Sequence, residues 1–277
     1  MNELSFTVGQ KQRLLELGAE HNDLEKKFNS ELDREDFFKK TASNLTKVNI
    51  KNIDDFIQNR KKPLTRIIEE KIRAALIKIG FNEVVTPILI SRSSIEKMGI
   101  SECDPLWHQI LWLNDKECLR PMLAPNLYVI MEKLYSYSKP VRIFEIGQCF
   151  RRDTKGPMHL EEFTMLNLVE LDPEGEPRES ILRFIKIVME SIGINYDISS
   201  EGSEVYGETL DVVVNGMEVA SAAIGPKPMD ANWGIFSTWV GVGFGIERLA
   251  MISGNYNSVT RVSRSLIYLD GSRLNLK

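Results

Sequence analysis

Two strand hairpins constrain the fold of this chain more than any other feature of its sequence. In the first, residues 141–153 and 159–172 are apolar-rich runs on either side of a short loop at 154–158. In the second, the runs 209–214 and 217–225 flank Asn215-Gly216, which supplies the two positive-φ positions of a type I′ turn. Because a tight hairpin makes its two strands antiparallel, these segments favour an antiparallel sheet.

Amphipathic helices are predicted between and around these strands. Residues 64–79 carry apolar side chains at helical spacing and end at Gly80, and residues 124–138 and 178–193 form two more predicted helices. Residues 108–123 are predicted to form a further hairpin. The combination predicts an α+β fold, an antiparallel sheet flanked by helices. Residues 1–62 contain few large apolar side chains and predict a short helical appendage, so we divide the chain into 1–62 and 63–277.

Composition restricts the class of protein. Hydrophobic residues make up 43% and charged residues 27% of the 277 residues, which is typical of a globular chain with a substantial core. No apolar run is long enough to span a bilayer, and the early charges of the N-terminus do not fit a signal peptide. The three cysteines and three histidines lack disulfide or zinc spacing. We therefore expect a cytoplasmic protein that does not associate with membranes.

Charge is unevenly distributed along the chain. The net charge is −4, yet residues 39–66 hold eight Lys or Arg against Asp54 and Asp55. The segment could hold a polyanion against one part of an acidic protein, or it could be an ordinary solvated face. Charge alone does not decide between these two interpretations.

A glycine-rich strand is the first candidate site. Gly241, Gly243 and Gly245 alternate along it, so one face of the strand is bare and a flat ring or a phosphate can approach the backbone. Ile246-Glu247-Arg248 then opens an apolar helix and brings a planar cation to the same place. The spacing does not fit a GxGxxG dinucleotide motif, and the βαβ context of that motif is missing.

The first hairpin carries a second candidate site. Its strands place Arg151 near Phe163, so a phosphate could be bound bidentately by the arginine while an aromatic ring stacks on the phenylalanine. His159, beside the loop, could donate to a phosphate as well. Taken singly, each residue also fits a structural role, since most strand phenylalanines simply pack in a core.

In this order, the helix–strand junction around Pro87, the Phe150-Arg151…His159…Phe163 segment and the Gly241…Glu247-Arg248 segment resemble the three signature motifs of class II aminoacyl-tRNA synthetases. The resemblance covers roughly residues 60–277. The strings at 119–128, 159–168, 205–212 and 241–249 are similar to the pyrrolysyl-tRNA synthetases, in the subgroup without a separate N-terminal tRNA-binding domain. The resemblance implies a class II catalytic domain over 63–277, a homodimer, and ligation of pyrrolysine to a suppressor tRNA through an aminoacyl-adenylate.

The resemblance also implies roles for individual residues. Arg151 and Arg248 are the expected catalytic residues, and ATP is the expected co-substrate. Hard oxygen donors suit Mg²⁺, and the matched positions are Glu218 and Ser221. Asp153 stands where the family usually has Glu, one methylene longer. The full set of expected ATP-binding residues is Arg151, Asp153, His159, Phe163, Glu218, Ser221 and Arg248.

The expected amino-acid pocket depends on one polar residue. Strand alternation places Asn167 on the same face as Phe163, Met165 and Val169, where a buried amide needs a partner. In the family this asparagine holds the side-chain amide carbonyl of pyrrolysine, and Tyr206 matches a lid. The expected pocket residues are Leu127, Tyr128, Met131, Asn167, Val169, Tyr206, Trp239 and Gly241.

Contacts with the tRNA are expected from the basic segment and from the loop of the first hairpin. Three alternatives remain open: a catalytically silent paralogue that acts as a binding or regulatory protein, a synthetase with another amino-acid substrate, and a plain nucleic-acid-binding module. The last leaves the glycine-rich motif unexplained. The candidate tRNA-binding residues are Lys39, Lys40, Lys61, Lys62 and Lys155.

Overall fold

The computed structural model describes residues 4–152, 156, 158–203 and 207–276, and the chain divides into two compact units. The sheet unit is Ile67–Leu249. The terminal unit combines Met1–Arg66 with Ala250–Lys277. Among the helices in the described ranges, none has the length and apolar character that crossing a membrane requires.

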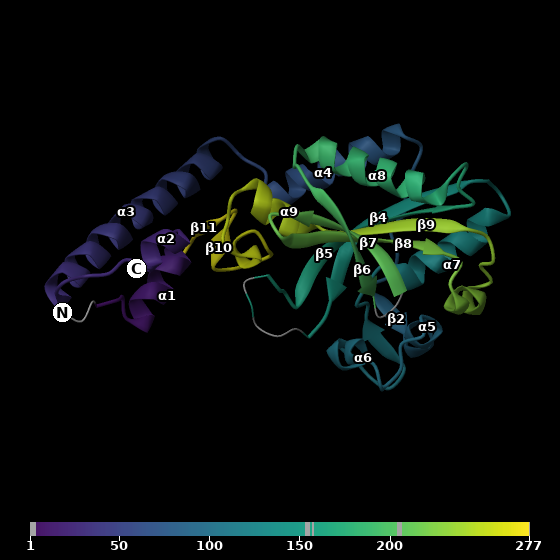
Figure 1. Cartoon of the computed structure of the whole chain (residues 1–277), viewed down its shortest axis with the longest axis horizontal. Coiled ribbons are helices and arrows are strands. Elements are labelled where there is room, and N and C mark those ends of the chain that lie inside the picture. The colour runs from purple at the N-terminus through teal and green to yellow at the C-terminus, as the bar shows by residue number, and fades with distance from the viewer. Residues whose placement is uncertain (1–3, 153–155, 157, 204–206, 277) are drawn as a thin grey trace. The chain divides into compact units, whose positions relative to one another are not determined.

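Across the described residues, the sheet unit is built on a seven-stranded sheet in the order β1-β4-β5-β9-β8-β7-β6 (Figure 1). Every neighbouring pair is antiparallel except β1 with β4. The strands are β1 Asn82–Glu83, β4 Val141–Phe150, β5 Glu162–Leu171, β6 Asp197–Ser203, β7 Gly207–Val214, β8 Met217–Gly225 and β9 Trp239–Gly245. A separate pair consists of β2 Leu89–Ser91 and β3 Glu117–Leu119.

Helices cover both faces of this sheet, which confirms the predicted α+β fold. In Figure 1, α4 and α8 lie on one side of the strands and α7 on the other. The helices that lie wholly or partly in the sheet unit are α4 Leu64–Lys78, α5 Arg92–Lys97, α6 Pro105–Gln109, α7 Ala124–Tyr135, α8 Pro177–Ile192, the 3-10 helix η1 Pro228–Trp233 and α9 Ile246–Ser253.

Alternation along the central strands gives the sheet two different faces. The core face carries fully buried apolar side chains such as Leu168, Val242 and Phe244, and α8 packs on it. The opposite face, which we call the glycine face, carries the three alternating glycines of β9 and the paired positions of β5. Its far end is covered by α7, whose buried side chains form one cluster with Val169 and Trp239.

Both hairpins that constrain the fold are present. Strands β4 and β5 pair over their full length, and Asn215 and Gly216 have φ values of 52° and 77°, as the predicted turn between β7 and β8 requires. The predicted hairpin over residues 108–123 is confirmed in its central part, where Trp112 and Cys118 form an antiparallel bridge and the N–H groups of Leu113 and Leu119 bond to the carbonyls of Glu117 and Leu111. Its first residues belong to α6 instead, and β3 pairs with β2 as well.

The terminal unit has a small core of its own. Phe6, Leu14, Ala19, Leu24 and Phe28 are buried together, so the N-terminal residues do more than form polar helices. One of the helices is 28 residues long and begins after Ser30, whose side chain accepts from the backbone N–H of Asp33. The elements of this unit are α1 Val8–Leu17, α2 His21–Leu24, α3 Glu31–Gln58, η2 Val259–Arg261, β10 Tyr268–Leu269 and β11 Ser272–Arg273.

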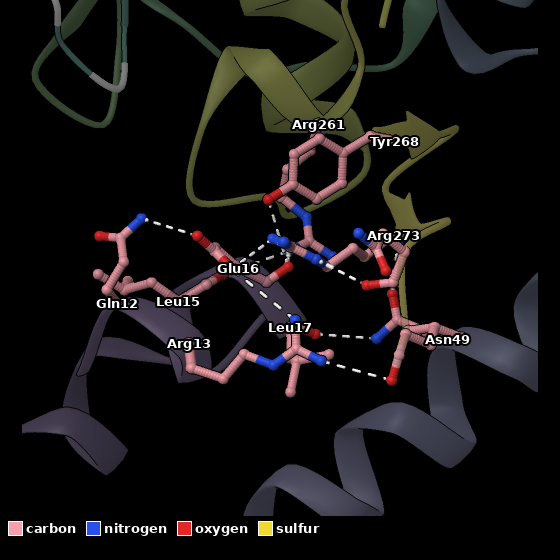
Figure 2. A network of polar contacts seen from close by, with 11 residues as sticks. Gln12, Arg13, Leu15, Glu16, Leu17, Asn49, Arg261, Tyr268 and Arg273 are labelled. Atoms are coloured by element: carbon pink, nitrogen blue, oxygen red, sulfur yellow. Dashed lines mark hydrogen bonds and ion pairs between the residues drawn. The ribbon is translucent and has the colours of Figure 1, made fainter. Parts of the chain in front are cut away.

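A polar network holds the C-terminal segment against α1 and α3 within this unit (Figure 2). The buried guanidinium of Arg261 donates to the carbonyl oxygens of Glu16 and Gly271, and that of Arg273 pairs with the Glu16 carboxylate at 2.5 Å. Asn49 donates to the carbonyl of Leu17 and accepts from the backbone N–H of Arg273. Arg261 and Asn49 thus satisfy the carbonyls of Glu16 and Leu17, which the end of α1 leaves without helical partners.

Candidate active site

The glycine face is bare where the sequence pattern predicted it. Gly241, Gly243 and Gly245 stand opposite Val169, Asn167 and Met165 of β5, so these three positions of β9 add no side chain to the face, while the ring of Trp239 lies beside Gly241. The residues between these glycines point to the core face and are buried. A ligand can therefore reach the backbone of β9 from one side while the strand remains anchored from the other.

Arg248 lies over one end of the glycine face. A Cβ placed on Gly245 would lie 3.6–3.8 Å from the stem of Arg248, and the Arg248 Nη1 donates to the carbonyl of Glu218 at 2.9 Å. The preceding residue fixes this helix start, because both carboxylate oxygens of the buried Glu247 accept from the Thr164 backbone N–H, at 3.0 and 2.8 Å. The sequence pattern alone gives Glu247 no role, and in the structure it joins α9 to β5.

Arg151 and Phe163 meet as the hairpin predicted. The guanidinium carbon of Arg151 lies 5.4 Å from the centre of the Phe163 ring, and its Nε donates to the carbonyl of Pro121 at 2.8 Å. The backbone N–H of Arg151 bonds to Glu161, which extends the strand pair beyond β4. His159 is exposed beside the loop. Asp153 and Lys155 lie outside the described residues.

A β-bulge brings Glu218 and Ser221 to the same face. Three positions apart on a regular strand, they would point to opposite faces, but the β7–β8 register shifts between Val212 and Val213. Ser221 consequently pairs with Asp211 and Gly243 in one row across the sheet, while Glu218 pairs with Val213, two positions beyond Asp211. Glu218 is about half exposed, with its carboxylate 4.0 Å from the Arg248 guanidinium.

Glu218 and Ser221 fit a magnesium ion only as part of a larger coordination shell. Within the described ranges, no group of three or more His, Cys, Asp or Glu side chains gathers as a metal cage. A carboxylate and a hydroxyl from one face suit Mg²⁺, because this ion keeps several waters and shares the oxygens of bound phosphates. The chemistry of Glu218 and Ser221 is therefore compatible with a magnesium ion that is also held by water and phosphate oxygens.

Asn167 is the polar residue on the apolar part of the glycine face. It stands between Glu145 of β4 and Gly243 of β9, and a Cβ on Gly243 would lie 3.1 Å from its Oδ1. The side-chain oxygen thus leans over the bare backbone of β9. Met165 leans over the same glycine, since its methyl carbon lies 3.4 Å from that Cβ position.

The expected apolar walls are gathered beside Asn167. Five of them are nine-tenths or more buried in one cluster, whereas Tyr206 lies outside the described residues. Gly241 supplies bare backbone next to the ring of Trp239, whose Cζ3 lies 3.2 Å from the position of an added Cβ. The clustered residues are Leu127, Tyr128, Met131, Val169 and Trp239.

Sequence reasoning missed two groups of buried polar residues that lie next to the expected site residues. Buried Arg120 and Glu145 form an ion pair at 2.8 Å, and Thr86 donates its hydroxyl to the same carboxylate at 2.6 Å. Buried Asp230 accepts from Tyr128 and Trp239. Neither group has a local signal, because its members come from separate parts of the chain.

The buried cysteines offer no nucleophile to this site. Cys149 stands opposite Phe163, but burial raises the pKa of its thiol to about 12. Burial likewise raises the pKa of Cys118 to about 11. Both thiols are therefore protonated at neutral pH, and the chemistry of the site rests on arginines and oxygen donors.

The candidate tRNA-binding lysines that the structure describes lie in the terminal unit. Lys39 and Lys40 are exposed on α3, and Lys61 and Lys62 are exposed after it. Lys61 forms an ion pair with Asp55, and this hydrogen bond is the main cause of a lowered Asp55 pKa. The Lys61 charge is thus partly neutralised within the protein.

Comparison with known proteins identifies relatives of the whole chain. Residues 47–270 match the family model described as tRNA synthetases class II core domain (F). A crystal structure of pyrrolysyl-tRNA synthetase from Desulfitobacterium hafniense matches at 43% identity with a TM-score of 0.93, covering 99% of each chain. A second structure of a pyrrolysyl-tRNA synthetase from that organism matches at 42% identity with a TM-score of 0.91, covering 98% of this chain and 95% of that one.

Curated relatives match a smaller part. A threonine–tRNA ligase of Anaplasma marginale is 33% identical over 132 residues, which are 45% of this chain and 21% of that protein. One from Ehrlichia chaffeensis is 29% identical over 135 residues, also 21% of its length. The chain thus spans about a fifth of the length of these curated relatives.

Proposed function

Since the chain belongs to the class II tRNA synthetases and, within them, to the pyrrolysyl-tRNA synthetase family, we propose that it ligates pyrrolysine to a cognate suppressor tRNA through an aminoacyl-adenylate formed from ATP. The observation that carries the choice of amino acid is Asn167, the amide between Met165 and Val169 on the glycine face, which stands opposite bare Gly243 and near the buried side chains of α7. A partly buried amide favours a substrate whose own polar group forms a hydrogen bond with it.

In the first step, an oxygen of the substrate carboxylate attacks the α-phosphorus of ATP. The new bond joins this oxygen to phosphorus, and the bond to the β-phosphate oxygen breaks, so that pyrophosphate leaves. Arg151 and Arg248 bring two guanidinium groups to the same end of the glycine face, beside Phe163 and Gly245, where they neutralise charge on the phosphates. The adenine stacks on Phe163, and Arg248, at the end of the glycine-rich motif, covers the other face of the adenine.

Glu218 and Ser221 are the residues that would hold Mg²⁺ beside the phosphates. The ion supplies positive charge to the phosphate oxygens when it is bound. His159 adds a donor near the same phosphates, and Asp153 belongs to the ATP site at the position of the usual glutamate. No side chain has to accept a proton in this step, because the substrate carboxylate is already ionised at neutral pH.

In the second step, the aminoacyl group passes from the adenylate to the 3′ end of the tRNA. We assign tRNA binding to the basic residues of the terminal unit, together with Lys155 of the hairpin loop. The support is an exposed basic segment on a chain whose net charge is −4. We place the reaction in the cytoplasm, in keeping with three cysteines that are all free thiols.

We also propose a homodimer, formed through the helix–strand junction around Pro87, which resembles the first of the three class II motifs. Val85, Ile88 and Leu89 expose 90%, 39% and 51% of their surface although they are apolar. Ile77, on α4, is also exposed. Exposed apolar side chains of this kind fit an interface with a second copy of the chain.

Amino-acid-dependent exchange between ATP and pyrophosphate tests the proposal. The twenty common amino acids should give no exchange, whereas pyrrolysine or an Nε-carbamate lysine should. Exchange with a common amino acid would keep the reaction and overturn the substrate. A folded protein that binds ATP but catalyses no exchange would be a silent paralogue, and the proposed function would be wrong.

A further inference from the structure

Asp230 is a fully buried carboxylate in the 3-10 helix η1 of the sheet unit. Its Oδ1 accepts a hydrogen bond from the Tyr128 hydroxyl at 2.7 Å. Its Oδ2 accepts from the Trp239 indole Nε1 and from the Lys227 backbone N–H, both at 2.6 Å. Among the residues the structure describes, no cation pairs with it, so these donors stabilise its charge.

The indole of Trp239 is held flat against the sheet by this bond. A Cβ on Gly225 would lie 1.8 Å from the indole Nε1, and one on Gly241 would lie 3.2 Å from Cζ3 at the other end of the ring. The ring therefore spans the bare backbone of β8 and β9. Two glycines make room for it, and Asp230 fixes which way it points.

The same carboxylate fixes the ring of Tyr128. That ring stacks on Trp233 with 5.5 Å between centroids and meets Trp239 edge-on at 5.9 Å. Tyr128 comes from α7 and Trp239 from β9, so Asp230 links a helix and a strand that both contribute to the proposed pocket. A buried hydroxyl and a buried indole N–H each need an acceptor, and one side chain serves both.

We propose that Asp230 is a positioning residue that determines which lysine derivatives the enzyme accepts. By fixing Tyr128 and Trp239 it sets the width of the apolar end of the pocket, and therefore the size of the Nε-substituent that fits. The inference rests on the proposed function for the identity of the substrate. It goes beyond that function in assigning selectivity to a side chain that need not touch the ligand.

Replacement of Asp230 separates positioning from folding. D230A removes the acceptor, so the Michaelis constant for pyrrolysine should rise about tenfold or more while that for ATP changes little, because a hydrogen bond to a charged group is removed beneath the amino-acid pocket. D230N keeps an oxygen for Trp239 and Lys227 and can donate to the Tyr128 oxygen, so its rise should be smaller. Equal rises for both substrates, no rise in D230A, or a D230N defect as large as that of D230A would overturn the proposal.

Helix α7 offers a matched control if D230A does not fold. Y128F removes only the hydroxyl that bonds to Asp230, whereas Y135F removes a hydroxyl on the same helix that bonds to Asp172 and Ser237. Y128F should raise the Michaelis constant for pyrrolysine more than that for the smaller Nε-acetyl-lysine, and Y135F should change neither. Identical behaviour of the two variants would contradict the assignment.

An NMR measurement that does not depend on catalysis tests the hydrogen bond between Asp230 and Trp239. The four tryptophans give four indole N–H signals in a ¹⁵N-tryptophan NMR spectrum. The signal that disappears in W239F should lie downfield in the wild type and move strongly in D230N, since its acceptor loses a charge. An unmoved signal would overturn the role of Asp230. If the wild type exchanges with no lysine derivative, the proposed function fails instead, and these signals still show whether Asp230 holds Trp239.

Discussion

At the scale of single residues, Asn167 depends on the absence of a side chain on the next strand. Its oxygen lies where a Cβ on Gly243 would approach to 3.1 Å, which is closer than ordinary van der Waals contact. Gly243 has extended backbone that alanine can adopt, so its substitution adds a methyl group without backbone strain. A substitution of Gly243 therefore tests the placement of the Asn167 side chain.

We expect G243A to weaken amino-acid recognition. The methyl group displaces the Asn167 amide by a few tenths of an ångström, and the Michaelis constant for pyrrolysine should rise by about tenfold, as expected for a misplaced hydrogen bond in a site that excludes water. G9A is the control, because an added Cβ there meets nothing within 4 Å. Exchange kinetics measure both variants, and an unchanged constant in G243A would show that Asn167 does not contact the substrate.

The two buried thiols predict how stability responds to alkaline pH. The unfolded thiols titrate near 9, whereas burial raises the folded pKa values to about 11 for Cys118 and about 12 for Cys149. Above pH 9 the unfolded chain therefore binds fewer protons than the folded one. The thiol contribution to stability is complete below pH 9 and is lost as the pH rises through 11 and 12.

Urea unfolding at pH 8 and pH 10 measures this effect. The free energy of unfolding of the wild type should fall more steeply than that of C149A, by up to about 1.4 kcal/mol per pH unit for one thiol. At pH 8, iodoacetamide should modify the exposed Cys103 and leave the other two unmodified in the native state. Equal pH dependence in the wild type and C149A would contradict the buried-thiol assignment.

At the scale of elements, the sequence predicts the strands but not every irregularity within them. Alternation places Phe163, Met165 and Asn167 on one face, and the register bears this out. Alternation alone would separate Glu218 from Ser221, since they are three positions apart. The bulge that reunites them has no marker such as glycine or proline at residues 218–221, so only the family resemblance pointed to the pair.

A buried ion pair on the glycine face, beside Asn167, joins three elements. Arg120 follows β3 and pairs with Glu145 of β4. The Thr86 hydroxyl donates a hydrogen bond to the same carboxylate and accepts one from Asn126 of α7. Gly147 is necessary here, because a Cβ would lie 2.2 Å from the Arg120 guanidinium. The start of α7, which supplies a wall of the proposed pocket, thus depends on this pair.

We expect E145A to destabilise the protein by about 3–5 kcal/mol, because it leaves the Arg120 charge buried without its partner. The half-exposed pair Arg73–Glu83 is the control, and E83A should cost about 1 kcal/mol or less. Urea unfolding gives both values. The double variant R120M/E145L should recover part of the loss, and a cost for E145A no larger than for E83A would show that the buried pair does not stabilise the fold.

At the scale of the whole molecule, residues far apart in the chain form one compact unit. The terminal unit combines residues 1–66 with residues 250–277, and the division at residue 62 stays a prediction. The hydrogen bonds responsible join Arg261 to Leu15 and Arg273 to Asn49, more than 200 residues apart in the chain. Local periodicity cannot reveal pairs of this separation.

This division predicts that tRNA binding and adenylate formation can be altered separately. Lys40 and Lys47 are exposed on α3 at a spacing of seven residues, and Lys71 and Lys78 are exposed on α4 of the sheet unit at the same spacing. At that spacing two side chains lie on nearly the same side of a helix. The two pairs therefore differ in the unit that carries them and are otherwise closely matched.

We expect K40Q/K47Q to weaken tRNA binding and leave exchange between ATP and pyrophosphate unchanged. Each lysine–phosphate ion pair that the substitutions remove should lower the slope of log affinity against log salt by about one, so the slope of the double variant should fall by up to about two. K71Q/K78Q removes the same charge and should change neither the slope nor the exchange rate. Filter binding over a salt series measures the slopes. If the two variants weaken tRNA binding equally, the effect belongs to net charge, and α3 is not a tRNA-binding surface.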